Sequence, residues 1–584
     1  MATATGRLLT ALAVGCLLAV GCEADPGGQP ASDDAADADP QAGEGPDAGA
    51  EAGGEEAGEP PREPGQPPPW AREARIYQVF TDRFRDGDPG NNVEVDPAAD
   101  GSFSEALRNW MGGDLRGVIE GLDHIEAAGF TTIWLSPVSE TAAFHGYHPT
   151  DLLAVDPSFG SLEELRALVD EAHARDLRVV YDLVLNHTSD EHPWFQDVLA
   201  ACEDSEHFEW YSFSTCDAEA GAYDYATFLG LEELPQVNLN HGPAQDYVTD
   251  VVVPFHLSEE EVALPDGSTV QGLGMDGLRL DHATGPPMAF WEELAEAVAE
   301  VDPEAYVFGE VWDSEHDALA RYADALHGAV DFPLHFALVD ALAGDIGLGR
   351  IDRSVREGLE VYGEGLVAPT FLDNHDVERF VHAAGGGEQG RARLAVALTV
   401  QYALPGPPIV YNGTEIGMGQ SDSGPIEGTL GWRDRWYREP LPWTGELEGG
   451  PADWAHADEV DGWTLQEPDL DTLDLVARLG QAREGARALV DGTYDPVVAE
   501  RELLAFERRD GDDDRVLAIV HDGEEPVEVS LADLYGEAVP DGVTLTSLLD
   551  DAEHHSGEGD LAITLDALDA ALLAVDGELT DPPD

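Results

Sequence analysis

The 584-residue chain contains no lysine, so arginine supplies all 29 of its basic residues, against 119 aspartate and glutamate residues. A formal net charge of -90 repels polyanions, which argues against binding to nucleic acid or to an anionic lipid surface. Solubility and adaptation to a salt-rich habitat, where screening relieves self-repulsion, both explain this acidity better than bulk binding of cations. The 43% hydrophobic content excludes wholesale disorder.

Long apolar runs are also scarce, and the first one is short. Arg7 precedes the apolar residues 8–20, a run too short to span a membrane stably, and Gly21 and Cys22 follow it. Residues 18–22 resemble a bacterial lipobox, in which the cysteine is lipidated and becomes the mature N-terminus. We therefore predict a lipoprotein-type signal peptide over residues 1–22, with an ordinary secretory signal as the alternative. Either signal implies export, and lipidation of Cys22 implies a membrane anchor at the cell surface or in the periplasm.

Residues 23–69 consist mostly of Ala, Gly, Pro, Asp and Glu and contain almost no large apolar side chains. Such a segment cannot bury enough surface to offset the entropy of ordering, so we predict a disordered acidic tether. Folded sequence begins near Trp70, and the remaining length suits two or three domains.

One short apolar segment, residues 275–282, delivers Arg279 and Asp281 at its end. Residues two apart on a strand point to the same side, so the guanidinium can hold and orient that carboxylate. Three further segments have the same build, apolar residues followed by polar ones: residues 179–187, 306–310 and 370–376. All four are predicted to be parallel strands that present polar groups at one rim of a barrel.

In their order and spacing, these four segments resemble the signature regions of the α-amylase family of glycoside hydrolases. The resemblance implies an α/β fold: a (β/α)8 TIM barrel over residues 70–487, with a small excursion domain after strand three over residues 188–240. Beyond residue 488, alternating apolar runs separated by turn residues predict a C-terminal antiparallel β-sandwich domain over residues 488–584. The polar residues 258–272 have no functional assignment.

The resemblance also assigns the chemistry. Asp281 is expected to be the nucleophile, Glu310 the general acid/base, and Asp376 the group that binds the ring hydroxyls in the transition state. Asp182 is expected to brace the strand ends. Five further residues are expected to contact the sugar or to hold the nucleophile ionised: His145, Tyr147, His187, Arg279 and His375.

Residues 82–92 form a loop rich in carboxylates, amides, Gly and Pro, which suits a hard cation such as Ca²⁺. Composition alone leaves a plain polar turn equally open. The loop resembles the calcium site of cyclodextrin glucanotransferases and neopullulanase-like enzymes, which implies Ca²⁺ as a cofactor. The ligands matched in this way are Asp86, Asp88, Asn91, Asn92, the carbonyl of Gly112, and Asp114.

Two cysteines, Cys202 and Cys216, remain once Cys16 and Cys22 are assigned to the leader. An even pair in an exported chain predicts a disulfide.

Two departures from the family pattern bear on specificity. Gln236 stands where typical α-amylases carry a calcium-ligating Asp, and Thr284 and Gly285 stand where they carry a Lys-His pair. Neopullulanase-like members also depart at the position of Gln236, although they usually carry an N-terminal β-domain where this chain has a tether.

The leading expectation is a retaining endo-type hydrolase of α-1,4-glucosidic bonds in starch-like glucans or maltodextrins. A cyclomaltodextrinase- or neopullulanase-like hydrolase, or a glucanotransferase, would use the same carboxylates. A non-catalytic surface glucan-binding lipoprotein would be expected only if a catalytic carboxylate were lost, and none is. The expected partner is the α-glucan, with membrane contact only through the lipid anchor.

Overall fold

The computed structural model of the chain describes residues 66–93, 109–363, 365–421, 436–443, 466–511, 514–577 and 579. The predicted signal peptide with Cys22, and all but the last four residues of the predicted tether, lie outside this part of the chain. Among the described residues, no helix has both the length and the apolar character needed to cross a membrane.

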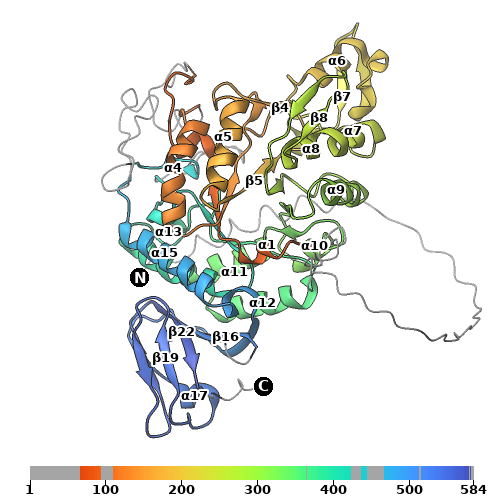
Figure 1. Cartoon of the computed structure of the whole chain (residues 1–584). Coiled ribbons are helices and arrows are strands. Elements are labelled where there is room, and N and C mark those ends of the chain that lie inside the picture. The colour runs from red at the N-terminus through yellow and green to blue at the C-terminus, as the bar shows by residue number, and fades with distance from the viewer. Residues whose placement is uncertain are drawn as a thin grey trace, which may run out of the picture. The chain divides into compact units, whose positions relative to one another are not determined.

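Eight parallel strands form the central sheet (Figure 1), in the spatial order β12-β11-β10-β5-β2-β1-β14-β13. A parallel bridge between Gly328 and Val367 joins the two ends of this order, so the sheet closes into a barrel. The fold is the expected TIM barrel. Its strands are β1 (Ile76–Val79), β2 (Thr132–Leu135), β5 (Arg178–Leu183), β10 (Gly277–Leu280), β11 (Tyr306–Gly309), β12 (Gly328–Ala329), β13 (Thr370–Phe371) and β14 (Pro408–Tyr411).

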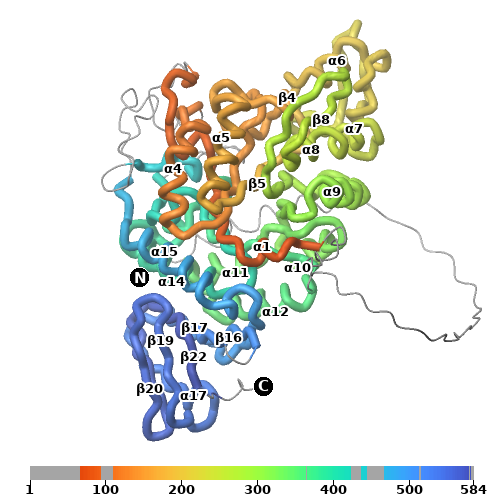
Figure 2. The backbone as a smooth tube through the Cα atoms, in the orientation of Figure 1, coloured from red at the N-terminus to blue at the C-terminus, as the bar shows by residue number. Residues whose placement is uncertain are grey.

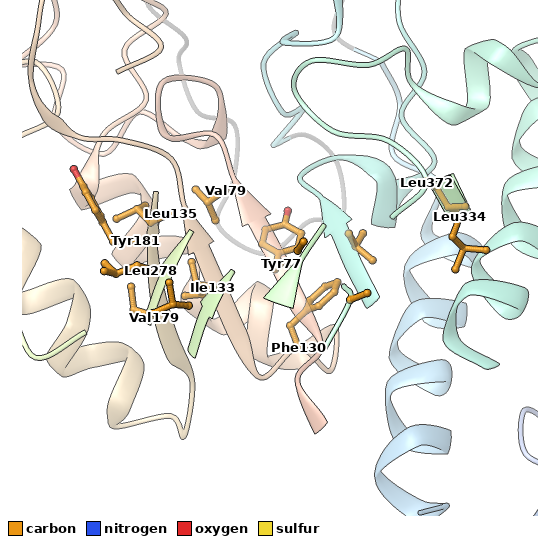
Figure 3. Packing of buried hydrophobic residues seen from close by; sticks show 14 of the residues in the cluster. Tyr77, Val79, Phe130, Ile133, Leu135, Val179, Tyr181, Leu278, Leu334 and Leu372 are labelled. Atoms are coloured by element: carbon orange, nitrogen blue, oxygen red, sulfur yellow. The ribbon is translucent and has the colours of Figure 1, made fainter. Parts of the chain in front are cut away.

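Strand residues alternate between two apolar clusters, as the two-residue period of a strand requires. Outward-facing residues pack against the surrounding helices; Figure 3 shows those on neighbouring strands, including Tyr77, Val79, Ile133, Leu135, Val179 and Leu278. The opposite residues form a second cluster inside the barrel, among them Ile76, Trp134, Val180, Tyr306 and Phe308. Gln78 pairs with Trp134, and Trp134 pairs with Val180. Arg279, two residues beyond the partner of Val180, pairs with Phe308. The polar side chains of Gln78 and Arg279 therefore lie on the inner face near the strand ends.

Helices cover the outside of the barrel: α4 (Leu115–Ala127), α5 (Leu162–His173), α9 (Met288–Val301), α10 (His316–Ala320), α11 (Phe332–Leu342), α12 (Gly349–Tyr362), α13 (Phe380–Ala383), α14 (Gly387–Ala403) and α15 (Leu470–Gly485). Side-chain caps fix several of their starts. The Asp114 carboxylate accepts the N–H of Gly117 at the start of α4, and Ser161 accepts that of Glu164 at the start of α5. Short helices α1 (Trp70–Glu73) and α2 (Thr81–Phe84) flank β1.

One strand is shorter than the sequence suggested. An apolar run at residues 328–333 indicates a sixth strand of that length, but β12 ends at Ala329 and α11 begins at Phe332. The Asp331 carboxylate accepts the N–H of Leu334 at 2.9 Å, and Pro333 lies in the first turn of the helix. This cap and the proline convert the second half of the run into a helix start.

The insertion between β5 and β10 carries its own small elements, which Figure 2 shows together. They are α6 (Pro193–Ala201), β6 (Phe213–Asp217), β7 (Ala222–Tyr225), α7 (Gly242–Tyr247), α8 (Val253–Leu257), β8 (Glu261–Ala263) and β9 (Thr269–Gln271). Cys202 and Cys216 are joined by a disulfide, with their Cα atoms 5.7 Å apart. The polar residues 258–272 form the hairpin of β8 and β9. A second hairpin pairs β3 (Ser139–Thr141) with β4 (Pro149–Val155).

After α15 and the short α16 (Ala488–Asp491), the chain forms the expected antiparallel C-terminal β-domain. Its main sheet has the order β15-β16-β17-β22-β19-β20, and β18 pairs with β21 beside it. An apolar cluster of its own lies between them. The elements are β15 (Thr493–Ala499), β16 (Leu503–Asp510), β17 (Asp514–His521), β18 (Val527–Ser530), α17 (Leu531–Tyr535), β19 (Thr544–Ser547), β20 (Glu553–His555), β21 (Ala562–Leu565) and β22 (Asp569–Asp576).

Candidate active site

The Arg279 guanidinium lies at the centre of a cluster of carboxylates at the C-terminal rim of the barrel. Its Nη1 donates to Asp182 Oδ1 at 2.6 Å and to Asp281 Oδ1 at 3.0 Å, and its Nη2 lies 3.1 Å from Glu310 Oε1. Asp281 and Glu310 are the first residues after β10 and β11. The position directly after a barrel strand therefore places both carboxylates against one guanidinium.

Asp281 is 9% exposed and shares Arg279 with two other acids. Burial raises the pKa of its carboxyl well above the usual value, repulsion from Glu310, Asp182 and Asp376 adds to this, and Arg279 opposes it. Arg279, which was expected to keep Asp281 ionised, contacts it as expected but also serves Asp182 and Glu310.

Glu310 receives a hydrogen bond from the backbone of the residue that follows Asp281. The His282 N–H donates to Glu310 Oε2 at 3.0 Å. His282 has φ 45°, a left-handed conformation that is uncommon for a residue other than glycine and tends to mark functional sites. This backbone conformation leaves one carboxylate oxygen of Glu310 facing Arg279 and the other facing an amide.

Asp376 is held from two sides. Arg438 Nη2 donates to Asp376 Oδ1 at 2.6 Å, and His375 Nε2 lies 3.0 Å from Asp376 Oδ2. Burial acts to raise the pKa of Asp376, but His375 and Arg438 hold it well below its usual range. Asp376 is thus held ionised, which suits a group that accepts hydrogen bonds from sugar hydroxyls.

Tyr147 links the carboxylate cluster to His375. Its hydroxyl donates to Asp182 Oδ2 at 2.9 Å and lies 2.9 Å from His375 Nε2, while the two rings stack with centroids 5.3 Å apart. The His145 ring also stacks against Tyr147, with centroids 5.8 Å apart, and its Nδ1 accepts the Tyr147 N–H. Burial lowers the pKa of His145 well below its usual value, so this imidazole is neutral.

His187 and His375 have both ring nitrogens engaged within the protein. His187 Nε2 donates to the carbonyl of Tyr147 at 3.0 Å, and its Nδ1 faces the Asn186 amide at 3.2 Å. The Nδ1 of His375 faces the Gln78 amide at 2.7 Å. The structure therefore brings every predicted catalytic and sugar-binding residue to one rim, with these two histidines serving the scaffold of the site as well.

The two departures from the family pattern meet at Asn186. The Gln236 amide donates to Asn186 Oδ1 at 3.0 Å. A Cβ added at Gly285 would lie 1.9 Å from that same oxygen. Because Asn186 fills this space, a side chain at position 285 would have to displace it, which explains why glycine stands there.

The predicted calcium loop folds around Asp114. Its carboxylate accepts hydrogen bonds from the N–H groups of Gly87, Asp88 and Gly117 and from the Asn91 side-chain amide. The Asn92 amide donates to Asp86 Oδ2 at 2.8 Å. The amide oxygens of Asn91 and Asn92 are buried and accept no hydrogen bond from any residue that the structure describes.

Gly112 closes the other side of this loop. It has φ +94°, and a Cβ there would lie 2.5 Å from Asn92 Oδ1 and 3.1 Å from Asp86 Oδ2. The predicted ligands thus converge. In the described part of the chain, no three His, Cys, Asp or Glu side chains form a metal cluster. Any ion in this loop would therefore depend on amide and carbonyl oxygens as well as on carboxylates, and Ca²⁺ accepts all of these.

Sequence reasoning missed several residues of the site. Arg438 lies 62 residues beyond Asp376, in a segment with no recognised motif. Gln78 and Trp134 lie within strands and face inward, where the Trp134 N–H donates to Asp182. Trp312 is 44% exposed, two residues after Glu310, and stacks on Phe332. A tryptophan two residues after the predicted acid/base was a usable signal in the sequence, whereas the contact made by Arg438 becomes visible only in the fold.

Comparison with known proteins places these observations in a family. The family model described as "Alpha amylase, catalytic domain" matches residues 78–228 and 249–485. Alpha-amylase 2 of Dictyoglomus thermophilum is 29% identical over 440 residues, covering 75% of this chain and 67% of the relative. Neopullulanase 2 of Thermoactinomyces vulgaris is 32% identical over 378 residues, covering 63% of this chain and 60% of the relative. The chain thus spans about two thirds or less of the length of these two relatives.

Among solved structures, a cyclomaltodextrinase matches with a TM-score of 0.70 and 25% identity, covering 88% of this chain and 79% of that one. The match extends over the barrel and the C-terminal domain, since it covers more of the chain than the catalytic-domain model does.

Proposed function

Because the chain belongs to the α-amylase family of glycoside hydrolases, we propose that it hydrolyses α-1,4-glucosidic bonds of maltodextrins and cyclodextrins with retention of configuration. The observation that carries this proposal is the contact of Asp281 and Glu310 with opposite nitrogens of the Arg279 guanidinium. Carboxyl groups held this close suit the retaining mechanism, in which no water has to fit between acid and nucleophile in the first step.

In the first step, Asp281 attacks the anomeric carbon while Glu310 donates a proton to the leaving glycosidic oxygen. A covalent glycosyl ester on Asp281 forms and the glycosidic bond breaks. In the second step, Glu310 takes a proton from water, which attacks the same carbon and releases Asp281. Asp376, ionised by Arg438 and His375, accepts hydrogen bonds from the ring hydroxyls. The apolar faces of Tyr147 and Trp312 offer surfaces on which sugar rings can stack.

The comparisons favour a cyclomaltodextrinase- or neopullulanase-like substrate range over the endo-acting α-amylase that motifs alone suggest. Neopullulanase 2 has the higher identity of the two relatives compared above, and a cyclomaltodextrinase is among the matching structures. The Gln236 position supports this range, because neopullulanase-like enzymes resemble this chain in departing there from typical α-amylases, and Gln236 donates to Asn186 at the edge of the site. Starch is the second candidate substrate, and the similarity to Alpha-amylase 2 supports it.

A time course of products from β-cyclodextrin, pullulan and soluble starch tests this range. We expect ring opening of the cyclodextrin, followed by short maltodextrins, to outpace the depolymerisation of starch. Rapid starch cleavage without action on cyclodextrin would reverse the order of the two candidates. Proton NMR of the first product formed should show the α-anomer, and initial release of the β-anomer would refute retention.

We further propose that the loop around Asp114 holds a calcium ion. The residues that would hold it are Asp86, Asp88, Asn91, Asn92 and Asp114, with the carbonyl of Gly112. The amide oxygens of Asn91 and Asn92, which are buried and accept no hydrogen bond from a described residue, support this assignment, since buried polar atoms are normally satisfied. The bound ion would contribute positive charge that offsets repulsion between the carboxylates and orders the loop before α4.

For the N-terminal region we propose export with lipidation of Cys22, on the strength of the lipobox-like residues 18–22. Mass spectrometry of the N-terminal peptide from cell envelopes tests this. A diacylglyceryl group on Cys22 is the expected result, and an unmodified N-terminus produced by cleavage elsewhere would favour the secreted alternative.

A further inference from the structure

Two segments far apart in the sequence pair at the edge of the active site. Residues 186–188 follow β5, and residues 235–237 return beside them from the insertion. His187 and Gln236 are partners in an antiparallel bridge, the Val237 N–H donates to the Asn186 carbonyl at 3.0 Å, and the Thr188 N–H donates to the Pro235 carbonyl at 3.1 Å. The backbone therefore holds the Gln236 side chain next to Asn186.

From there, a chain of hydrogen bonds runs to Tyr147. The Gln236 Nε2 donates to Asn186 Oδ1 at 3.0 Å. The Asn186 Nδ2 lies 3.2 Å from His187 Nδ1, and His187 Nε2 lies 3.0 Å from the carbonyl oxygen of Tyr147.

The direction of every bond in this chain is fixed by its last member. The carbonyl of Tyr147 can only accept, so His187 Nε2 must carry a proton. Burial lowers the pKa of His187 to about 3, so the ring is neutral and Nδ1 has no proton. Nδ1 therefore accepts from the Asn186 N–H, which turns Asn186 Oδ1 toward Gln236, and Gln236 must present its N–H.

We propose that Gln236 is a positioning residue for catalysis: its amide sets the orientation of Asn186 and hence the tautomer of His187, which anchors Tyr147. Tyr147 in turn donates to Asp182 at 2.9 Å, and Asp182 holds Arg279, the partner of Asp281 and Glu310. A residue outside the sugar-binding surface thereby fixes the geometry of both catalytic carboxylates.

The substitution Gln236→Glu exchanges donors and acceptors along this series of hydrogen bonds with little change in the shape of the side chain. A carboxylate cannot donate, so the Asn186 amide turns its N–H toward it and presents Oδ1 to His187. The ring proton then moves to Nδ1, and the bare Nε2 faces the Tyr147 carbonyl, which is repulsive. Because small misplacements of catalytic groups cost up to about a hundredfold in rate, we expect kcat to fall by about tenfold to a hundredfold on a maltodextrin.

The substitution Gln196→Glu is the matched control. It makes the same change of charge in the same insertion, but the Gln196 amide donates to the backbone carbonyl of Asp190 at the surface. We expect its kcat to match that of the unmodified enzyme. The melting temperatures of both variants should lie close to that of the parent, which separates positioning from loss of folded protein.

Nitrogen NMR of the histidine rings gives a readout that a merely structural role would not move. The His187 signals, identified by their absence in His187→Gln, should show a protonated Nε2 in the parent enzyme and a protonated Nδ1 in Gln236→Glu. Asn186→Asp, which presents only acceptors to the ring, should draw a proton to Nδ1 as well. An unchanged tautomer in both variants, or a kcat in Gln236→Glu equal to that of the control, would overturn the proposal.

Discussion

At the scale of single residues, the site depends on the sharing of one guanidinium among several acids. Arg279 contacts Asp182, Asp281 and Glu310, and removing a buried cation would leave three carboxylates without their main counterion. Asp281, the proposed nucleophile, can by contrast be neutralised without altering the packing, because an asparagine has the same shape as an aspartate.

We therefore expect Asp281→Asn to lose at least about a thousandfold in kcat, since it removes the attacking group, while the melting temperature stays the same or rises. The stability expectation follows from burial and the neighbouring acids, which raise the pKa of Asp281 and so penalise its charge. Initial rates on β-cyclodextrin and a thermal unfolding curve measure the two effects. Hydrolysis at near the parent rate would exclude Asp281 as the nucleophile.

At the scale of elements, helix α11 begins at an acid that is unusually costly to ionise. Burial raises the pKa of Asp331 from 3.8 to about 7, although the Leu334 N–H and the Tyr362 hydroxyl stabilise its charge. His316 Nδ1 lies 3.8 Å away. The folded state thus binds this proton more tightly than the unfolded state, so its stabilising contribution is complete below about pH 4 and is lost as the pH rises through 7.

Asp331→Asn keeps the helix cap and removes this titration. Relative to the parent, we expect its free energy of unfolding to rise between pH 4 and pH 8, by roughly 2–4 kcal/mol in all. Urea unfolding at several pH values measures the difference. Asp340→Asn, a half-exposed acid of the same helix paired with Arg350, is the control. Parallel pH curves for the parent and Asp331→Asn would show that Asp331 is ionised at no cost.

The loop between β1 and α4 gives a second prediction at this scale. A ligand that binds only the folded state stabilises it by about 2.7 kcal/mol at a hundred times its Kd. A chelator should therefore lower the melting temperature of the parent protein. The double variant Asn91→Ala/Asn92→Ala should melt lower and respond little to the chelator, whereas the surface variant Asn240→Ala should respond like the parent. Equal responses in all three proteins would remove calcium from this loop.

Sequence patterns locate elements better than they locate contacts across the fold. Asp281 and Glu310 could be placed because each directly follows an apolar strand, and the parallel barrel then brings them together. The start of α11 could not, because the apolar residues on either side of Asp331 suggest a strand, and its role as a helix cap becomes clear only from its contact with Leu334. The series of hydrogen bonds from Gln236 to Tyr147 could not be predicted from the sequence either, because it joins three loops whose side-chain directions depend on the finished structure.

At the scale of the whole molecule, some of the few cationic side chains bind buried backbone carbonyls instead of surface carboxylates. Arg508 of β16 is buried and donates to the carbonyls of Ala403, Leu489 and Gly492, and Arg483 donates to those of Tyr402 and Leu404. Arg508 thus binds the end of α14 to the C-terminal domain, and Arg483 binds it to α15. Positive charge at the end of α14 also suits the helix dipole. They leave fewer of the 29 arginines to neutralise acids at the surface.

Stability should therefore rise with salt. With 119 acidic residues, far more than residues 23–69 contain, like charges crowd the folded surface and repel one another. The Debye length falls from about 10 Å at 0.1 M to about 3 Å at 1 M, so neighbouring carboxylates are decoupled only at the higher concentration. We expect the melting temperature of residues 23–584 to increase by several degrees between 0.1 and 2 M NaCl, with calcium held saturating. Sucrose at equal osmolality, which strengthens burial without screening charge, is the control and should give a smaller increase. A flat or falling melting temperature in NaCl would mean that the surface acids are spaced widely enough to be tolerated, and that the acidity serves solubility rather than life in salt.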